Sequence, residues 1–256
     1  PPGCAEYRGT LAAGMREHVG ALATWPRGIF HAAGRANAGD PVRCAAWTAC
    51  SPAESRYPEV MSVESLYSRL ERLLPKVQKP IQYVGGELNS TVKDWDEATV
   101  RWVLMYPDAY EVGLPNQGIQ ILYEILNELP GTLAERTYAV WPDLEALMRA
   151  EGLPQFTVDA HRPVRAFDIL GVSFASELGY TNLLTALDLA GIPLNAVERT
   201  DEDPIVLAGG HAAFNPEPIA DFIDAAVLGD GEQIVIAITE IVREWKSEGS
   251  PGGRDE

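Results

Sequence analysis

Two glycine-rich turns contain the residues whose types and spacing best suit the binding of a ligand. Gly209-Gly210-His211 follows the apolar run Ile205 to Ala208, and Gly229-Asp230-Gly231-Glu232 follows the apolar run Ala225 to Leu228. Short apolar runs of this kind are typical of buried parallel strands, and glycine lets the backbone turn sharply and lets a ligand approach closely. Open α/β sheets bind ligands in a crevice at the carboxyl ends of their strands. The two turns therefore predict one side of a ligand-binding crevice.

The loop after the first predicted strand is a further candidate. Asp108 follows the nearly continuous apolar run Val100 to Tyr106, and Tyr110 and Gly113 lie in the stretch that leads into the next helix. A glycine-bearing loop that opens a helix presents backbone N–H groups at the positive helix end, which suits an anion or a polar ligand. Tyr110 could close over a bound ring or fill the edge of the sheet.

Several other candidates have a plain structural explanation beside the functional one. Ser173 and Ser176, at the end of the third predicted strand, could hydrogen-bond a ligand or cap the following helix. His211 could contact a ligand, but a single histidine after a strand is more often a hydrogen-bonded loop residue. Glu217 and Glu232 could stabilise the positive ends of helices rather than contact a substrate.

The chain contains no recognisable catalytic constellation. We find no Ser-His-Asp set in a known context, no Gly-x4-Gly-Lys phosphate loop and no dense His/Asp/Glu cluster with metal spacing. Cys4, Cys44 and Cys50 are the three cysteines, so the body of the chain holds neither a disulfide nor a thiolate metal site. We therefore expect no catalytic residues and no metal ligands, and a domain that binds and positions.

The charge of the chain restricts its partners. The formal net charge is −17, and residues 1–60 contain six Arg and five Asp or Glu, which leaves −18 for residues 61–256. An acidic body argues against nucleic acid and anionic lipid as direct partners. No apolar run approaches the roughly 20 residues needed to cross a bilayer. We expect a soluble protein without a membrane partner, and the cysteine usage favours a cytoplasmic location.

Strands and helices alternate along the chain. The predicted strands are 100–106, 135–141, 168–176, 205–210 and 225–228, and the predicted helices between the first four are 119–129, 144–151 and 180–190. Alternation at roughly 30 residues per strand indicates a parallel sheet built from βαβ units. Five strands with candidate ligand loops favour a doubly wound, flavodoxin-like or Rossmann-like α/β fold. His161 lies in a connection, where we expect it at the surface.

The sequence divides into four parts. Residues 1–60 are rich in Ala, Gly, Arg and Pro and have no sustained period, so we expect a disordered extension or a stretch translated ahead of the true start. Residues 61–99 are predicted to form a helix, up to Leu74, and a cap on the main domain. Residues 100–245 are predicted to form the α/β domain, and 246–256 a polar linker.

Four motifs within residues 61–256 resemble those of a known family. They are Tyr110-Glu111-Val-Gly113 through Gly118, Gly171-Val-Ser173, Gly209-Gly210-His211 with Asn215-Pro216-Glu217-Pro218, and Gly229-Asp230-Gly231-Glu232, in the family's order. The segment resembles the N-terminal, cobalamin-binding-like domain of radical SAM proteins, most closely the uncharacterised fused radical SAM family common in actinobacteria. In that family the module precedes a barrel in which Cys-x3-Cys-x2-Cys holds a 4Fe–4S cluster beside S-adenosylmethionine.

The resemblance implies a function, a cofactor and a partner. It implies an accessory domain that binds a cobalamin-type cofactor through Asp108, Tyr110, Gly113, Ser173, Ser176, Gly209, Gly210, His211, Gly229, Asp230, Gly231 and Glu232. It also implies a C-terminal radical SAM domain as partner, which would hold the 4Fe–4S cluster and S-adenosylmethionine, because this chain lacks Cys-x3-Cys-x2-Cys. We therefore expect a fragment that ends before the catalytic barrel of a radical SAM enzyme.

One departure from the cobalamin pattern leaves alternatives open. Proteins that replace the lower base of cobalamin use Asp-x-His-x-x-Gly, in which the imidazole coordinates cobalt and the Asp orients it. Here the run is Asp108-Ala-Tyr110-Glu-Val-Gly113, so this loop supplies no histidine ligand. Cobalamin could bind without a protein axial ligand, or the fold could persist as a non-catalytic interaction module without the cofactor. A flavin or nucleotide protein is a third alternative, although no Gly-x-Gly-x-x-Gly opens the first helix.

Overall fold

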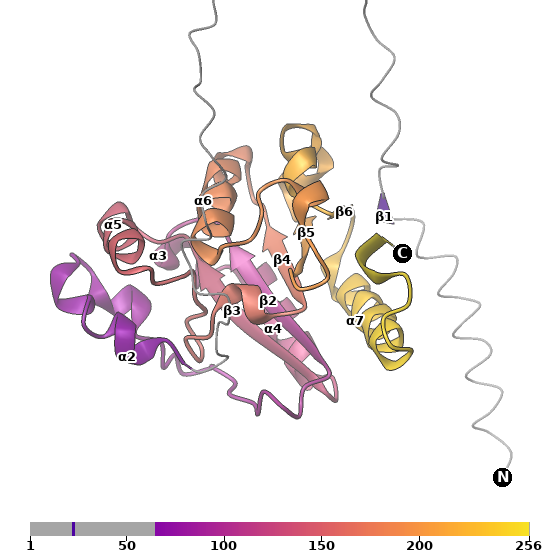
Figure 1. Ribbon diagram of the computed structural model, residues 1–256, viewed down its shortest axis with the longest axis horizontal. Coiled ribbons are helices and arrows are strands. Elements are labelled where there is room, and N and C mark those ends of the chain that lie inside the picture. The colour runs from indigo at the N-terminus through magenta and orange to yellow at the C-terminus, as the bar shows by residue number, and fades with distance from the viewer. Residues whose placement is uncertain (1–21, 24–64, 256) are drawn as a thin grey trace, which may run out of the picture.

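The computed structural model describes Leu22–Ala23 and residues 65–255, and its centre is a mainly parallel sheet (Figure 1). The five parallel strands are β2 (Val100–Tyr106), β3 (Thr132–Tyr138), β4 (Ile169–Ser173), β5 (Ile205–Gly209) and β6 (Ala225–Val227). They stand in the order β6-β5-β4-β2-β3, and β1 (Leu22–Ala23) pairs antiparallel with β6. In chain order the parallel strands run 2-1-3-4-5, which is the flavodoxin-like arrangement. The predicted fold class is confirmed.

Helices cover both faces of the sheet. The longer ones are α4 (Gln117–Glu128), α5 (Pro142–Glu151), α6 (Tyr180–Ala190) and α7 (Gly231–Ser247). Alternate residues of β2 separate the two faces: Trp102 and Leu104 pack with α4 and α7, whereas Val103 and Met105 pack with α6. Helix α5 lies beside α6, where Leu144 and Met148 meet Leu189. None of the helices among the described residues is both long and apolar enough to span a membrane.

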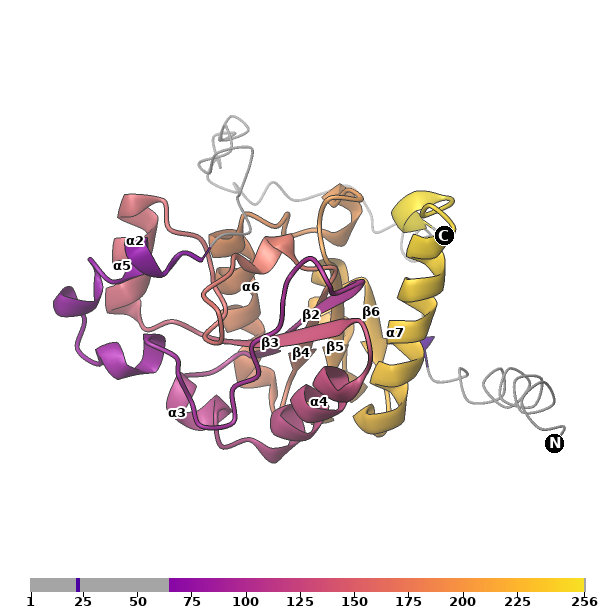
Figure 2. The same cartoon turned by 90° about the horizontal axis from the view of Figure 1, so that it is seen from below.

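Short elements fill the connections between these strands and helices. They are α2 (Tyr67–Leu70), α3 (Tyr110–Gly113) and 3-10 helices at Leu74–Lys76, Pro80–Tyr83, Val164–Ala166, Glu177–Gly179, Ala196–Glu198, His211–Phe214, Glu217–Phe222 and Gly253–Asp255. Both views place α2 beside α5 (Figures 1 and 2), where Leu70 and Leu74 pack with Met148. The helix predicted up to Leu74 is thus shorter in the structure, and its expected start lies outside the described residues, as does most of the segment 1–60.

Strand β3 forms one edge of the sheet, and other parts of the chain occupy its free side. The side-chain amide of Asn127 exchanges two hydrogen bonds with the backbone of Ala134, at 3.0 and 3.1 Å. Two residues further along, Arg136 donates its backbone N–H to Asp159 at 2.6 Å and accepts a bond from Val158 N at 2.8 Å. At Ala134 and Arg136, the backbone groups that point away from β2 are therefore already bonded.

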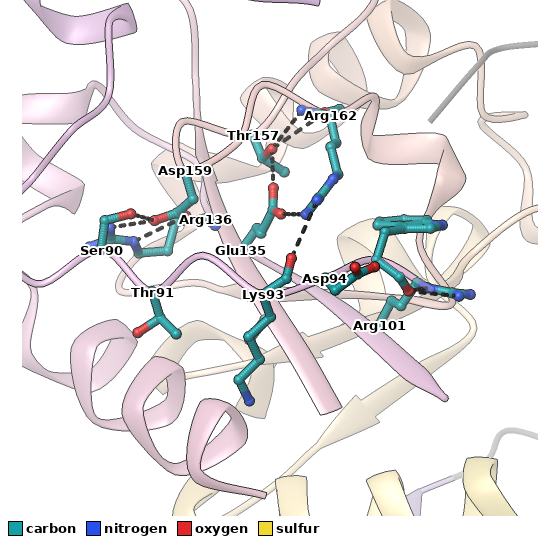
Figure 3. Close-up of polar contacts among 12 residues, drawn as sticks. Ser90, Thr91, Lys93, Asp94, Arg101, Glu135, Arg136, Thr157, Asp159 and Arg162 are labelled. Atoms are coloured by element: carbon teal, nitrogen blue, oxygen red, sulfur yellow. Dashed lines mark hydrogen bonds and ion pairs between the residues drawn. The ribbon is translucent and has the colours of Figure 1, made fainter. Parts of the chain in front are cut away.

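Two ion pairs fasten β3 to the connection that follows α5 (Figure 3). Arg136 pairs with Asp159, and the neighbouring Glu135 pairs with Arg162. Ser90 Oγ donates a hydrogen bond of 2.7 Å to Asp159, which ties the segment before β2 to the same network. These long-range pairs let a strand rich in polar residues lie buried. The strand runs from Thr132 to Tyr138, so it begins and ends three residues earlier than the predicted range 135–141.

His161 is buried, contrary to the surface position predicted for it. Its Nε2 lies 2.9 Å from the carbonyl oxygen of Tyr83, which can only accept, so Nε2 bears the hydrogen. Its ring stacks on Phe156 and meets Tyr67 edge to face. Burial lowers the pKa of His161, although the hydrogen bond to Tyr83 acts the other way. The neutral imidazole therefore joins the N-terminal segment to the main domain.

Candidate functional site

A crevice of about 260 Å³ opens at the carboxyl edge of the sheet, on the face covered by α4 and α7. Residues from β2, β4, β5 and β6 line it together with the first turns of both helices. Seven of the predicted cofactor-binding residues lie in its lining: Ser173, Gly209, Gly210, Gly229, Asp230, Gly231 and Glu232. The structure therefore brings together the two glycine-rich turns that the sequence singles out.

The floor of the crevice is apolar. Trp102 is 2% exposed, and its indole Nε1 donates a hydrogen bond of 3.0 Å to Thr239 Oγ1 on α7. Gly171 lies against the same ring, because a Cβ at this position would stand 3.1 Å from the indole. Leu207 adds a further apolar wall. Sequence reasoning missed Trp102, although its alternation with Leu104 along the strand was a signal that both share one face.

The two glycines at the end of β5 have different roles. Gly210 has a positive φ of 86°, and a Cβ here would lie 2.6 Å from the carbonyl oxygen of Phe174. The turn at Gly210 is thus imposed by the chain's own backbone. At Gly209 the nearest atom to an added Cβ is Val172 O, at 3.9 Å, so this glycine leaves open space at the crevice.

The first turns of α4 and α7 form one side of the crevice mouth. Asn116 caps α4 by accepting a 3.0 Å hydrogen bond from Ile119 N. Asp230 precedes α7 and Glu232 lies in its first turn, both are exposed, and Asp230 makes no side-chain capping bond. Carboxylates near a helix start interact favourably with its dipole. Because they already place negative charge there, the mouth suits a neutral or hydrogen-bond-donating group better than a phosphate.

The loop after β2 lies apart from the crevice. Tyr110 donates a 2.9 Å hydrogen bond from its hydroxyl to Glu87 Oε1, and its ring meets Tyr138 edge to face. Burial, reinforced by the bond to Glu87, raises the pKa of Tyr110 to about 12. Gly113 provides room for the Tyr138 ring, with which any Cβ would collide. Tyr110 therefore fills the sheet edge beside β3, and Asp108 lines a separate cavity.

Ser176 and His211 lie on exposed turns outside the crevice lining. Ser176 precedes a 3-10 helix without making a side-chain capping bond, so the structure shows no helix-cap role for it. His211 begins the 3-10 helix after Gly210. The crevice lining therefore lacks Ser176 and His211 among the predicted cofactor-binding residues. It also lacks Asp108, Tyr110 and Gly113.

The described residues do not fit an iron–sulfur cluster. Residues 65–255 contain no cysteine, and within the part of the chain that the structure describes no group of three or more His, Cys, Asp or Glu could hold a metal ion. A 4Fe–4S cluster needs cysteine thiolates as ligands. The crevice itself offers a different donor set, namely a serine hydroxyl, glycine backbone and two carboxylates at its mouth.

Strand order and a crevice at the carboxyl edge define a doubly wound, flavodoxin-like α/β protein. A family model described as radical SAM proteins, N-terminal, matches residues 118–256. The match spans more than half of the 256 residues, and the chain belongs to this family. Neither the comparison with curated proteins nor that with solved structures gives a match. The matched region begins at Gly118 and includes both glycine-rich turns, whereas the Asp108 to Gly113 loop precedes it.

Proposed function

We propose that this chain is the accessory domain of a radical SAM enzyme and that its crevice receives part of a cobalamin-type cofactor. One observation carries the proposal: in a member of the radical SAM N-terminal family, the glycine-rich turns after β5 and β6 converge with Ser173 over an apolar floor. Ligands of doubly wound sheets bind at this edge. The catalytic cluster and S-adenosylmethionine would belong to a C-terminal radical SAM domain in the parent protein.

The size of the crevice limits which part of the cofactor would enter. Its volume of about 260 Å³ is just below the range of about 300–1,000 Å³ that is usual for ligand pockets. A corrin ring is larger than this space, whereas the flat aromatic base of the nucleotide tail would lie against Trp102 and Leu207. Ser173 and the Gly209 backbone would offer hydrogen bonds, and the acidic mouth would keep the phosphate of the tail outside.

The cobalt would receive no side-chain ligand from the loop after β2. Asp108-Ala-Tyr110 provides a phenol where an imidazole would be needed, and that phenol is already bonded to Glu87. When bound, cobalamin would supply cobalt-centred chemistry that no side chain of this domain offers. The role of the chain would be to hold and orient the cofactor at the carboxyl edge of the sheet.

Titration of hydroxocobalamin into the full chain tests the proposal. We expect a change in the cobalamin absorption spectrum and co-elution of the cofactor on a sizing column. Gly209 lines the crevice on the same side of β5 as Leu207, so Gly209→Leu should fill it without a backbone clash and abolish co-elution. Ala146→Leu, on an exposed position of α5, is the matched control and should bind as the parent chain does.

A non-catalytic interaction module is the second candidate function. It is favoured by Gly113, Gly171, Gly210 and Gly231, at each of which a side chain would crowd the chain's own atoms. These glycines are therefore needed for packing, whether or not a ligand binds. Under this alternative, hydroxocobalamin would elute separately from the parent chain, and Gly209→Leu would leave every binding measurement unchanged.

A further inference from the structure

A second cavity, of about 280 Å³, lies at the same edge of the sheet on the opposite face. It is bounded by the ends of β2 and β3 and by α5 and α6. Its polar lining residues are Asp108, Glu145, Gln155, Asn182 and Thr185. No Lys, Arg or His belongs to this lining in the part of the chain that the structure describes. The proposed cofactor crevice uses none of these residues.

Gln155 provides the observation that points to a ligand. The residue is 1% exposed and lines the cavity, and its Oε1 is buried without a hydrogen-bond partner among the described residues. The hydrogen bonds of the amide nitrogen, Nε2, fix the orientation of this side chain. Nε2 donates to Tyr138 O and to Thr137 Oγ1, both at 2.9 Å, and the Thr137 hydroxyl is itself donating to a carbonyl. Since both partners act as acceptors, the amide cannot be turned over. Oε1 is therefore an acceptor that lacks a donor.

The rest of the lining also favours a donor. Asn182 donates a hydrogen bond of 2.9 Å from Nδ2 to Pro107 O, which leaves its Oδ1 as an acceptor. Asp108 lies exposed at the rim, with Oδ1 accepting from the following backbone N–H at 2.7 Å. Glu145 adds a second carboxylate, bonded through Oε1 to Arg149 at 2.9 Å. Acceptors and negative charge thus predominate around an unsatisfied oxygen.

Trp141 gives the cavity an aromatic wall. The ammonium group of Lys79, whose Nζ lies 4.6 Å from the ring centroid, already makes a cation–π contact with this ring. The ring therefore offers a ligand an apolar surface, whereas the charge of an ammonium group would be met by a carboxylate. A divalent metal ion is a poorer match, because the described residues contain no cluster of three acidic or imidazole ligands.

We propose that this cavity binds a small molecule through a primary ammonium group. The ammonium supplies the hydrogen that Gln155 Oε1 lacks, and the carboxylate of Asp108 balances its charge, since Glu145 is already paired with Arg149. The apolar part of the ligand lies against Trp141 and Leu189. The site is independent of the proposed cobalamin crevice, because the two cavities lie on opposite faces of the sheet.

Calorimetric titration of the full chain with n-butylammonium chloride tests the site, and n-butanol serves as the neutral probe of the same shape. We expect saturable binding of the ammonium and none of the alcohol. Asp108→Asn keeps the oxygen that accepts the local backbone bond but removes the charge, so it should weaken binding about tenfold, as loss of one charge-assisted bond does. Glu151→Gln, on α5 outside the lining, is the matched control and should bind within about twofold of the parent.

Gln155→Met tests the buried acceptor directly and should abolish saturable binding. If this variant fails to fold, the comparison of Asp108→Asn with Glu151→Gln decides the question. The proposal is overturned if butanol binds as tightly as butylammonium, if Glu151→Gln weakens binding as much as Asp108→Asn, or if the parent chain shows no saturable heat. It is equally overturned if calcium or magnesium chloride binds and displaces the amine. Hydroxocobalamin binding should be the same in Asp108→Asn and the parent chain, which separates this test from that of the crevice.

Discussion

Asp159 holds Arg136 through both carboxylate oxygens: Oδ1 lies 2.6 Å from the guanidinium Nη2, and Oδ2 accepts the backbone N–H at 2.6 Å. The side chains are 0% and 3% exposed. Burial lowers the pKa of Arg136, but the hydrogen bond and charge of Asp159 outweigh this effect and raise it overall. The guanidinium therefore stays charged, and it depends on this one carboxylate for most of its compensation.

Asp159→Ala should lower the free energy of unfolding by about 3 kcal/mol, because it leaves the buried guanidinium of Arg136 with only the longer contact of 3.7 Å to Glu87. The matched control is Asp188→Ala. Asp188 also pairs with an arginine, Arg149, but its side chain is 53% exposed, so the loss should be about 1 kcal/mol or less. Urea unfolding followed by circular dichroism measures both. Equal losses in the two variants would show that the buried Arg136–Asp159 pair stabilises the fold no more than the exposed Arg149–Asp188 pair does.

Gly210→Ala should destabilise the fold by about 2 kcal/mol or more, because alanine is strained at positive φ and its Cβ would meet Phe174 O. Gly229→Ala is the control for backbone strain alone, since Gly229 has φ of 111° and nothing within 4 Å of an added Cβ. The difference between the two midpoints of denaturation isolates the contact with Phe174. A larger loss of stability for Gly229→Ala than for Gly210→Ala would contradict the predicted clash with Phe174 O.

Stability should decrease below pH 6.5 through His161. Its pKa is lowered in the folded state from the ordinary value of about 6.5, first by burial. Below that value the unfolded chain binds a proton that the folded chain resists, so acidification favours unfolding. His161→Asn removes this contribution and suits the positive φ of 55°. Urea unfolding at pH 7.5 and 5.5 should show a smaller loss on acidification for the variant than for the parent, and equal losses would rule out this role.

Thr239→Val should cost about 1–3 kcal/mol, because the indole N–H of Trp102 would lose its acceptor while it remains buried. Thr181→Val, at an exposed position of α6, is the control and should change the free energy of unfolding by less than about 0.5 kcal/mol. Thermal unfolding measures both, and near-ultraviolet circular dichroism reports whether the crevice floor has shifted. An unchanged melting temperature for Thr239→Val would contradict the importance of this bond.

The order of the sheet and one side of the crevice could be predicted from the sequence. The apolar run before Gly209 is buried on both faces, and the run before Gly229 is buried at Ala226 and half-buried at its other positions. Short apolar runs of this kind indicate parallel strands. The carboxyl ends of parallel strands share one edge, so glycine-rich turns that follow them have to lie close together. This reasoning needs no knowledge of side-chain packing.

The rest of the site depends on long-range packing that a single sequence does not display. The face of the sheet on which a loop after a strand lies depends on the path that the chain takes to the next helix. Asp108 therefore lines the second cavity and not the crevice. His161 is buried against Tyr67 and Phe156, and the carbonyl group of Tyr83, which is distant in sequence, accepts its N–H. The polar sequence of β3 does not predict a buried strand, because the ion-pair partners of its charged residues, Asp159 and Arg162, lie in a different segment of the chain.

With the backbone of Ala134 and Arg136 already bonded on its free side, β3 offers few groups to a strand of another molecule. Open sheet edges are the usual templates for domain swapping and fibril growth. At the other edge, Leu22–Ala23 pairs with β6. Copies of this protein are therefore discouraged from joining sheet to sheet, and a partner that approaches the carboxyl edge meets glycine turns and helix ends instead of an unpaired strand.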